Sequence, residues 1–424
     1  MIKRDYYLNK LVHHMWNGEV KVITGIRRCG KSVLLFELFY EYLLAQGVPE
    51  DHIIKLELDQ RRYYKFRNPV TLCEYVESVI SDKKNETFYL FVDEVQFTIK
   101  VKDEENGDIE VTVYDMLNEL KAYKNLDVYV TGSNSKMLSK DIATEFRGRA
   151  TQIHVYPLSF DEFYSYTGGD KRDAFSQYML YGGMPRIPAF DDEKDKKTYL
   201  SNLYRELYVK DIVERNHLER EDILDAILDF IASQIGSLSN PTNIANALMS
   251  MRHEKINASL VSSYLTHTMD AFLIHMARRY DIKGKTYFNY PNKYYFADIG
   301  LRNARLNYRQ YDPGHIMENI IYNELIKRGY SVDVGVVTER TKKERIQREV
   351  DFVVNDGDRR IYIQSAYPMD NGQKVDSELR SLALTGDFFK KVIIRMDIPH
   401  NFYDDRGIYH CNLIDFLLGQ ADIS

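Results

Sequence analysis

Several residue types are scarce in this 424-residue chain, and their scarcity excludes whole classes of protein. Three scattered cysteines, Cys29, Cys73 and Cys411, form neither a disulfide framework nor a cysteine-rich zinc site, which favours a reducing, cytoplasmic setting. Ten prolines and 22 glycines exclude collagen-like and low-complexity chains. No apolar run approaches the roughly 20 residues that span a bilayer, and MIKRDYYLNK is no signal peptide, so we expect a soluble protein with no membrane partner.

Positive charge is not in excess either. The chain has 57 Lys and Arg against 63 Asp and Glu, which gives a formal net charge of −6. This argues against a basic coat for unspecific nucleic-acid binding but leaves room for a local basic channel. At roughly 100–200 residues per domain, the length predicts about two to four domains, each with its own core.

Strands and helices alternate in the N-terminal part of the chain. This alternation predicts a parallel sheet with helices on both faces. An Asn-Gly turn within residues 100–112 predicts a surface hairpin. The predicted strands cover residues 19–25, 53–58, 88–92 and 128–131, and the predicted helices cover residues 32–45, 70–81 and 114–123.

The remaining chain changes pattern twice. Residues 164–218 are helical, apart from a Gly-Gly-Met-Pro interruption at 182–185. Three helices and then a polar–apolar alternation over 272–296 give the order of a winged helix, the helices being at residues 222–235, 241–249 and 259–269. From about His315 the pattern is helix, strand, strand, helix, strand, which is again α/β.

The segment GIRRCGKS at residues 25–32 matches the phosphate-loop pattern G-x-x-x-x-G-K-[ST] between a predicted strand and a predicted helix. Its glycines let the backbone curl so that N–H groups and the helix N-terminus point at phosphates. Lys31 supplies positive charge, and the Ser32 hydroxyl can ligate Mg²⁺. We therefore predict a site for ATP and Mg²⁺ formed by Gly25, Arg27, Arg28, Cys29, Gly30, Lys31, Ser32 and Val33.

Two carboxylates end the apolar strand FYLFV. Asp93 is placed to hold Mg²⁺ together with Ser32, and Glu94 to polarise an attacking water as general base. Capping of the next helix is the alternative role. A pure nucleotide-binding switch needs the first acid but not the second, so the pair favours hydrolysis.

Four further polar residues are candidates for catalysis. Ser133 or Asn134 can orient the water if the strand before them lies beside the acidic strand, although Gly-Ser-Asn is also ordinary turn chemistry. Arg147 and Arg149, within EFRGR, are candidates for an arginine that reaches a neighbour's γ-phosphate. A solvated or ion-paired arginine is the alternative.

These motifs together resemble those of prokaryotic AAA+-type ATPases of the archaeal-ATPase group. More narrowly, they resemble the branch with a C-terminal restriction-endonuclease-like domain. The resemblance rests on VITGIRRCGKS, FVDEVQ, TGSNSKML, FRGRA, VYPLSFDEF, YGGMP, ENIIYNEL and REVDFVV. It implies an α/β fold with a P-loop AAA+-like parallel sheet (1–160), a helical lid (161–218), a winged helix (219–310) and a degenerate nuclease-like α/β domain (311–424).

The resemblance also implies roles for the site residues. Asp93 and Glu94 would be the acidic pair, and Ser133 or Asn134 the sensor. Arg149, with Arg147 behind it, would be the trans-acting arginine. A trans-acting arginine places ATP between subunits, which implies a homo-oligomeric ring, a hexamer or a heptamer.

Nucleases of the restriction-endonuclease fold place a helix Glu, a strand Asp and a following E-x-K around a metal. Here Glu318 and Asp351 fill the first two positions, but Gln364 replaces the second acid and Ala366 replaces the lysine. The resemblance therefore implies a nuclease fold without catalysis. Glu318 and Asp351 are equally compatible with a residual metal site and with merely solvated or capping carboxylates.

Two basic segments are candidate contacts to a DNA backbone, with a solvated charge run as the alternative. They are a predicted loop at 338–348 (TERTKKERIQR) and the wing residues Arg278, Arg279, Lys283 and Lys285. We therefore predict an oligomeric, Mg²⁺-dependent ATPase that binds and remodels DNA, including branched or junction DNA. The alternatives are a nucleotide-dependent signalling or defence switch that recognises a protein or ligand, and an active metal-dependent nuclease.

Overall fold

The computed structural model describes residues 2–102, 110–133, 150–289, 291–340, 344–357, 359–367 and 372–423. The chain divides into two compact units, one of Met1–Pro157 with Asp270–Phe272 and one of Leu158–Met269 with Leu273–Ser424. Of the helices within the described ranges, none combines the length and the hydropathy that a bilayer crossing demands.

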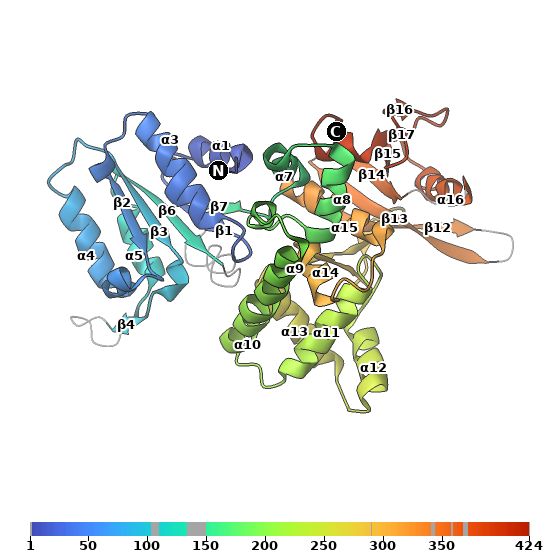
Figure 1. The fold of residues 1–424 in the computed structure, drawn as a ribbon, viewed down its shortest axis with the longest axis horizontal. Helices are drawn as coiled ribbons and strands as arrows, with labels where there is room; N and C mark the ends of the chain where they lie inside the picture. Colours follow the sequence, from blue (N-terminus) through green and yellow to red (C-terminus); the bar gives the residue numbers. More distant parts are fainter. Residues whose placement is uncertain are drawn as a thin grey trace. The chain divides into compact units, whose positions relative to one another are not determined.

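The first unit is an α/β structure built on one sheet (Figure 1). Its strands are β1 (Val20–Thr24), β2 (Ile53–Glu57), β3 (Phe88–Asp93), β4 (Val101–Lys102), β5 (Glu110–Val111), β6 (Leu126–Gly132) and β7 (Ala150–His154). Its helices are α1 (Asp5–His13), α2 (Lys31–Val33) continued by a π-helical segment (Leu34–Phe39) and α3 (Tyr40–Ala45), then α4 (Pro69–Ile80) and α5 (Val113–Leu120). Short 3-10 segments cover Glu50–His52, Arg61–Arg67 and Val95–Phe97.

The main sheet is parallel throughout, with the order β2-β3-β6-β1-β7. The prediction of a parallel sheet is therefore confirmed, and every strand and helix predicted before residue 132 is present. The predicted hairpin also exists, since β4 pairs antiparallel with β5, and its tip lies outside the described residues. The sequence pattern did not indicate β7, whose five residues carry three polar side chains.

Helices cover both faces of this sheet. On one face, α4 and α5 bury apolar residues such as Val76 and Leu117 against Val22 and Leu90. On the other face, Phe39 of the π-helical segment packs on the aromatic side chains of β3 and β6, with 4.9 Å between its ring centre and that of Tyr129. Both faces of every central strand are therefore buried, which is why these strands are continuous apolar runs.

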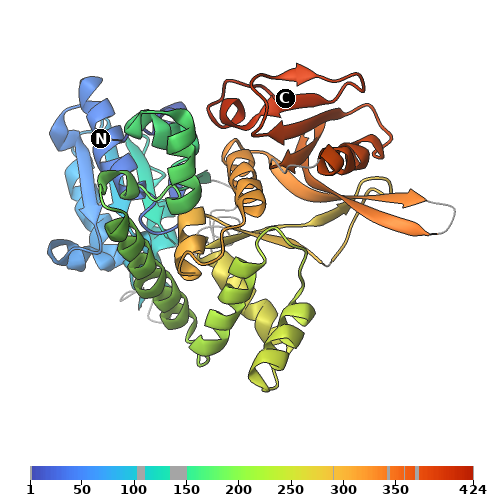
Figure 2. The same cartoon turned by 45° about the vertical axis from the view of Figure 1, so that its right-hand side comes forward.

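The second unit holds the remaining elements (Figure 2). Its helices are α7 (Phe160–Thr167), α8 (Lys171–Tyr181), α9 (Glu193–Asn202) continued by a π-helical segment (Leu203–Val209) and α10 (Lys210–Asn216), then α11 (Glu221–Ser233), α12 (Pro241–Arg252), α13 (Ala258–Asp270), α14 (Ile299–Arg305), α15 (Pro313–Lys327), α16 (Gly372–Ala383) and α17 (Leu413–Leu417), with a 3-10 segment at Ile187–Ala189. Its strands are β8 (Ile274–Ala277), β9 (Arg279–Asp281), β10 (Thr286–Tyr287), β11 (Lys293–Phe296), β12 (Ser331–Arg340), β13 (Arg345–Asp356), β14 (Arg359–Ala366), β15 (Lys390–Arg395), β16 (Phe402–Tyr403) and β17 (Tyr409–Asn412).

An eight-stranded sheet dominates this unit, with the order β10-β9-β12-β13-β14-β15-β17-β16. β12, β13 and β14 form an antiparallel meander, and β15 then runs parallel to β14. Helix α16 buries Leu382 against one face of this sheet. On α15, Tyr322 stacks on Tyr295 of β11 at 4.3 Å and lies 6.3 Å from the ring of Phe352 in β13.

Two sequence-based expectations about this unit need correction. Residues 338–340 end β12 and residues 345–348 begin β13, with Thr338 opposite Gln347, so these parts of the predicted loop are paired strands. Arg348 forms an ion pair with Glu339 across the two strands at 2.5 Å, so these two charges belong to the strand pairing. The segment 272–296 is split between two sheets: β8 pairs with β11, whereas β9 and β10 extend the eight-stranded sheet. The three helices before it lie where predicted, and the winged-helix assignment stays a prediction.

The Gly-Gly-Met-Pro interruption is explained by a tight backbone contact with the start of α14. Gly183 donates its N–H to Asp298 Oδ2 at 2.6 Å, and a Cβ on Gly183 would lie 2.0 Å from the carbonyl oxygen of Leu158. Asp298 also accepts the N–H of Leu301 at 3.1 Å, as the N-cap of α14. Burial raises the pKa of the Asp298 carboxyl to about 6.

Candidate active site

The backbone of the predicted phosphate loop requires glycine at two positions. Gly25, which directly follows β1, has φ +143°, and a Cβ there would lie 2.1 Å from the carbonyl oxygen of Val155. Gly30 has φ +97° immediately before α2. Larger side chains are therefore excluded where the loop leaves β1, and they are strained where the loop enters the helix.

Lys31 is buried within the curve of this loop. Only 4% of its surface is exposed, and its Nζ donates to the carbonyl oxygens of Gly25 at 3.0 Å and Ile26 at 3.1 Å. The ammonium group thus lies beside the first turn of a helix, where backbone N–H groups are unpaired and anions are favoured. This is the arrangement that a phosphate needs.

The other predicted loop residues differ in how they face solvent. Cys29 is fully buried and its Sγ donates to the carbonyl oxygen of Val155 at 3.2 Å, so its side chain packs the loop onto the end of β7. Arg28 is exposed with φ +59°, and Val33 is 39% exposed on the outer side of the helix. Arg27 donates from Nε to Ser133 Oγ at 3.3 Å, which links the loop to the end of β6.

An arginine that sequence reasoning missed fixes the loop from behind. Arg4 is 5% exposed and donates to the carbonyl oxygens of Cys29 at 3.0 Å and Tyr156 at 2.7 Å. Tyr7 of α1 accepts the backbone N–H of Tyr156 at 3.1 Å. Nothing in the spacing near the N-terminus signals this role, because it depends on where the segment after β7 passes.

The acidic pair lies beside the loop because of the strand order. β6 separates β1 from β3, and parallel strands bring their carboxyl ends to one edge of the sheet. Asp93 is 5% exposed and accepts a hydrogen bond from the hydroxyl of Thr131. Burial raises the pKa of the Asp93 carboxyl, and the hydroxyls of Thr131 and Ser32 oppose the rise.

Thr131 is a second residue that sequence reasoning did not single out. Its side chain is fully buried, and its hydroxyl donates to Asp93 Oδ1 while accepting the backbone N–H of Glu94 at 3.1 Å. One side chain of β6 therefore fixes both acids of β3. Glu94 itself adopts φ +52°, an unusual backbone conformation for a side chain of this size.

Ser133 and Gln96 complete a polar network around Glu94. Gln96 donates its amide to Glu94 Oε2 and, at 3.3 Å, to Ser133 Oγ. Ser133 Oγ lies 3.5 Å from Glu94 Oε2 and is the same atom that Arg27 contacts. The structure thus brings predicted residues Glu94, Ser133 and Arg27 together, and Gln96 joins them. The predicted residues Asn134, Arg147 and Arg149 lie outside the described residues.

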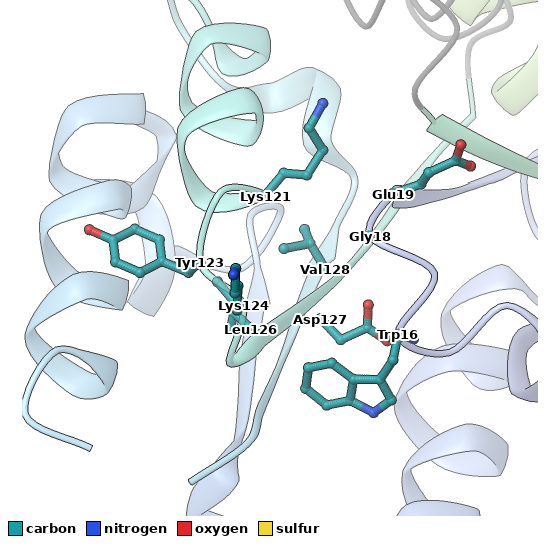
Figure 3. Close-up of a pocket in the computed structure, with 9 residues that line it drawn as sticks. All are labelled: Trp16, Gly18, Glu19, Lys121, Tyr123, Lys124, Leu126, Asp127 and Val128. Atoms are coloured by element: carbon teal, nitrogen blue, oxygen red, sulfur yellow. Dashed lines mark hydrogen bonds between the residues drawn. The ribbon is translucent and has the colours of Figure 1, made fainter. Parts of the chain in front are cut away.

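A pocket of ≈ 230 Å³ at the opposite edge of the sheet is not part of this site (Figure 3). It surrounds the beginning of β6, whereas the phosphate loop follows the end of the parallel strand β1. One of its two carboxylates, Asp127, forms an ion pair with Lys21 and accepts hydrogen bonds from the backbone N–H of Trp16 at 3.1 Å and the hydroxyl of Tyr129 at 2.8 Å. Asp127 therefore has a structural role, because its carboxylate holds Lys21, Trp16 and Tyr129 together.

The predicted nuclease-type residues line a separate pocket of ≈ 460 Å³ in the second unit. Glu318 of α15 and Asp351 of β13 are both there, as predicted. A lysine that was not predicted lies between them: Lys293 of β11 has its Nζ 2.8 Å from Glu318, 2.6 Å from Glu349 and 3.8 Å from Asp351. Ala366 is buried in the core, and Gln364 accepts the backbone N–H of Asp351 at 3.1 Å.

The fold and the site of the first unit define a P-loop ATPase domain of the AAA type. The model of a family described as an AAA domain matches residues 17–164, and models of two domains of unknown function match residues 172–312 and 313–407.

Two curated relatives cover most of the chain. An uncharacterized protein of Haemophilus influenzae is 32% identical over 406 residues, which cover 93% of this chain and 96% of that protein. An uncharacterized protein of Methanocaldococcus jannaschii is 27% identical over 84% of this chain and 76% of its own length. The chain belongs to the same family as the Haemophilus protein.

Solved structures show only remote likeness. The Aeropyrum pernix Orc1 protein in complex with DNA has a TM-score of 0.30 and 10% identity, over 72% of this chain and 93% of that one. AMPPCP-bound DnaA from Aquifex aeolicus has a TM-score of 0.31 and 14% identity, over 62% of this chain and 85% of that one. Likenesses of this size establish neither a substrate nor a partner.

Proposed function

We propose that this protein hydrolyses ATP with Mg²⁺ at the phosphate loop of its first unit. The observation that carries the proposal is the polar network that joins loop and acidic strand: Ser133 Oγ contacts both Arg27 of the loop, at 3.3 Å, and Glu94, at 3.5 Å, and Asp93 directly precedes Glu94. The Ser32 hydroxyl also opposes the rise in the Asp93 pKa, as a polar group beside that carboxyl does. A hydroxyl and a carboxylate are ligands that Mg²⁺ accepts beside phosphate oxygens. The donor set therefore fits the metal that ATP hydrolysis requires.

Each residue of the site has a role that follows from its chemistry. Lys31 and the unpaired N–H groups at the start of α2 bind phosphate oxygens. Ser32 and Asp93 would hold Mg²⁺, which when bound neutralises charge on the phosphates. Glu94 accepts the proton of an attacking water. Ser133 and Gln96 hold the Glu94 carboxylate through hydrogen bonds, and Ser133 also meets Arg27 of the loop.

The direct test is phosphate release from purified protein with ATP, in the presence and absence of Mg²⁺. Asp93→Asn keeps the shape of the side chain but removes the charge that would bind the metal. We expect this variant to need much more Mg²⁺ for a given rate. Unchanged Mg²⁺ dependence in a folded Asp93→Asn protein would contradict the assignment.

We further propose that the active form is a homo-oligomeric ring, in which Arg149 of one subunit contacts ATP on its neighbour and Arg147 supports it. The support is the Gly-Arg pattern that the chain shares with AAA+-type ATPases. Arg149→Ala should bind ATP without hydrolysing it. Mixing it with Lys31→Ala subunits should restore part of the rate, since each partner supplies what the other lacks. No recovery would favour a role within one subunit.

DNA is the partner that we propose, and the arrangement of basic residues supports it. β9 runs parallel to β12, so the turn after β9, with Lys283 and Lys285, and the beginning of β13, with Arg345, lie toward the same end of one sheet. All three side chains are exposed. Two basic segments that are distant in sequence therefore contribute to one end of this sheet, as a backbone-binding surface needs.

The measurement for this step is the ATPase rate with single-stranded, duplex and four-way-junction DNA at low and physiological salt. Stimulation that persists at physiological salt and falls when Lys283 and Lys285 are replaced by Ala would support DNA remodelling. A rate that none of the three DNAs changes would favour the signalling or defence switch, with a protein or ligand as partner. The free, buried cysteines agree with a cytoplasmic protein.

A further inference from the structure

A buried lysine occupies the centre of the nuclease-like pocket in the second unit. Lys293 comes from β11 and has a side chain only 3% exposed. Its ammonium lies among three carboxylates from two other elements, at 2.8 Å from Glu318, 2.6 Å from Glu349 and 3.8 Å from Asp351. Burial by itself lowers the pKa of Lys293, but the three carboxylates outweigh it and raise the pKa above its ordinary value. The ammonium is therefore charged.

Several of the oxygens that would coordinate a metal already have partners in the protein. Glu318 Oε1 accepts both the ammonium and the hydroxyl of Tyr295, the latter at 2.6 Å. Asp351 Oδ2 accepts the backbone N–H of Ser365 at 2.9 Å. Gln364, in the position of the second acid, directs its oxygen to the N–H of Asp351 and its amide nitrogen to Glu378. While the Lys293 ammonium is in place, the residues therefore do not fit a divalent cation of the kind that nucleases of this fold bind.

The spacing of the carboxylates leads to the same conclusion. Ligands of one cation must converge, and among the described residues it is Cys73, Glu77 and Glu119 in the first unit whose ligand atoms lie within 4.8 Å of one another. With the ammonium of Lys293 between them, Glu318, Glu349 and Asp351 do not meet this condition. Each of them instead faces the ammonium, which has three N–H donors and no need for six ligands.

We propose that the ammonium of Lys293 is the resident cation of this carboxylate cluster and takes the place that a divalent metal holds in nucleases of this fold. The second unit would then be a nuclease-like fold held together by an internal ion pair, without a metal and without cleavage. Because Lys293 is the first residue of β11 and the carboxylates lie on α15 and β13, the ion pairs also tie the β8–β11 pair to α15 and to the large sheet.

The proposal accounts for the loss of the motif lysine at position 366. In a nuclease of this fold the motif lysine acts beside a bound metal. If Lys293 takes the place of the metal, a lysine at position 366 would have no metal to assist. The pocket wall retains Glu349, 32% exposed, and Glu378, so without a divalent cation it repels phosphate. The inference is independent of the ATPase proposal, because it involves the other unit.

The test is Mn²⁺ binding by nucleotide-free protein, followed by electron paramagnetic resonance. Lys293→Met removes the ammonium and keeps an unbranched side chain, while Lys283→Met, at an exposed turn, is the matched control. We expect wild type and Lys283→Met to bind no Mn²⁺ through Glu318. We expect Lys293→Met to gain one site, because three carboxylates are then uncompensated, and the double variant with Glu318→Gln to lose it again by about 10-fold or more in affinity.

Each outcome decides the question. If Lys293→Met is unfolded in metal-free buffer, Mn²⁺ should restore its circular dichroism and the temperature of its transition, and failure to do so overturns the proposal. A folded Lys293→Met variant that gains no site overturns it as well. So does wild-type Mn²⁺ binding that Glu318→Gln abolishes. The last result does not depend on how the lysine variant folds.

Discussion

Replacing Thr131 by valine is the most informative single change in the first unit. Valine has nearly the shape of threonine, so the packing of β6 is retained and only the hydroxyl is lost. That hydroxyl donates to Asp93 and accepts the backbone N–H of Glu94 at 3.1 Å, and it is fully buried. The change therefore leaves one buried acceptor and one backbone donor without this partner.

The expected cost follows from those two groups. A buried polar group that loses its partner costs about 1–3 kcal/mol, and two such groups are affected, so we expect about 2–4 kcal/mol. For a unit of this size, that lowers the midpoint of thermal unfolding by roughly 5–15 °C. Thr131→Ser is the control, because it keeps the hydroxyl and loses only a methyl group, worth about 1 kcal/mol.

The pH dependence of the effect has a definite sign. Thr131 opposes the rise that burial imposes on the pKa of Asp93, so valine raises this pKa further. When the pKa of an acid is higher in the folded protein than in the unfolded chain, the protein loses stability as the pH rises above the unfolded-chain pKa. The reason is that ionising the acid inside the fold is penalised. The difference between wild type and Thr131→Val should therefore grow with increasing pH. The acidic limb of the Mg²⁺-dependent ATPase profile should move to higher pH.

Differential scanning calorimetry at several pH values, together with phosphate release, measures both effects. The reasoning is refuted if Thr131→Val unfolds at the same temperature as Thr131→Ser at neutral pH and hydrolyses ATP with the same pH profile. The hydroxyl would then carry no share in holding Asp93 and Glu94.

Two further predictions concern other parts of the chain. Lys31→Ala should abolish ATP binding or hydrolysis, because it removes the buried ammonium from the phosphate loop. Isothermal titration with ATP measures the binding. Turnover at the wild-type rate would contradict the assignment of the phosphate loop. Asp298→Asn should keep part of the hydrogen bonding, because its amide oxygen can still accept a backbone N–H of Gly183 or Leu301. It removes a carboxyl whose pKa burial raises to about 6. The free energy of unfolding of the variant, relative to wild type, should therefore increase by about 1 kcal/mol between pH 5 and pH 7.5, since wild type must ionise a buried acid over this interval. Denaturant titrations at both pH values measure this difference. The same difference at both pH values would contradict the raised pKa of Asp298.

The sequence was sufficient to predict β1, β2, β3, β6 and the helices between them, because local signals and fold agree there. Continuous apolar strands that lead into a glycine loop or end in two acids are typical of one edge of a parallel sheet. The roles of Thr131 and Arg4 could not be read in this way. Thr131 is an ordinary strand residue until the order β3-β6-β1 places it beside Asp93, and Arg4 contacts a segment that follows a strand with no apolar signal.

In the second unit, long-range pairing decided what the sequence pattern could not. The charge pattern of residues 338–348 predicts a loop, because nothing local shows that Glu339 and Arg348 form an ion pair across two strands. Lys293 lies on a strand of the predicted wing, 25 positions before Glu318, so no motif spacing connects the two. Only the packing of β11 against α15 brings them together.

The measurement that tests the central claim most directly is ATP hydrolysis by Glu94→Gln. The glutamine keeps the size of the side chain and its contacts with Ser133 and Gln96, but it cannot accept a proton. We predict that this variant binds ATP with wild-type affinity and releases phosphate at least about 100-fold more slowly, the usual share of a general base. Hydrolysis at the wild-type rate, in a preparation whose Lys31→Ala counterpart is inactive, would show that Glu94 is not the base and would contradict the account of this site.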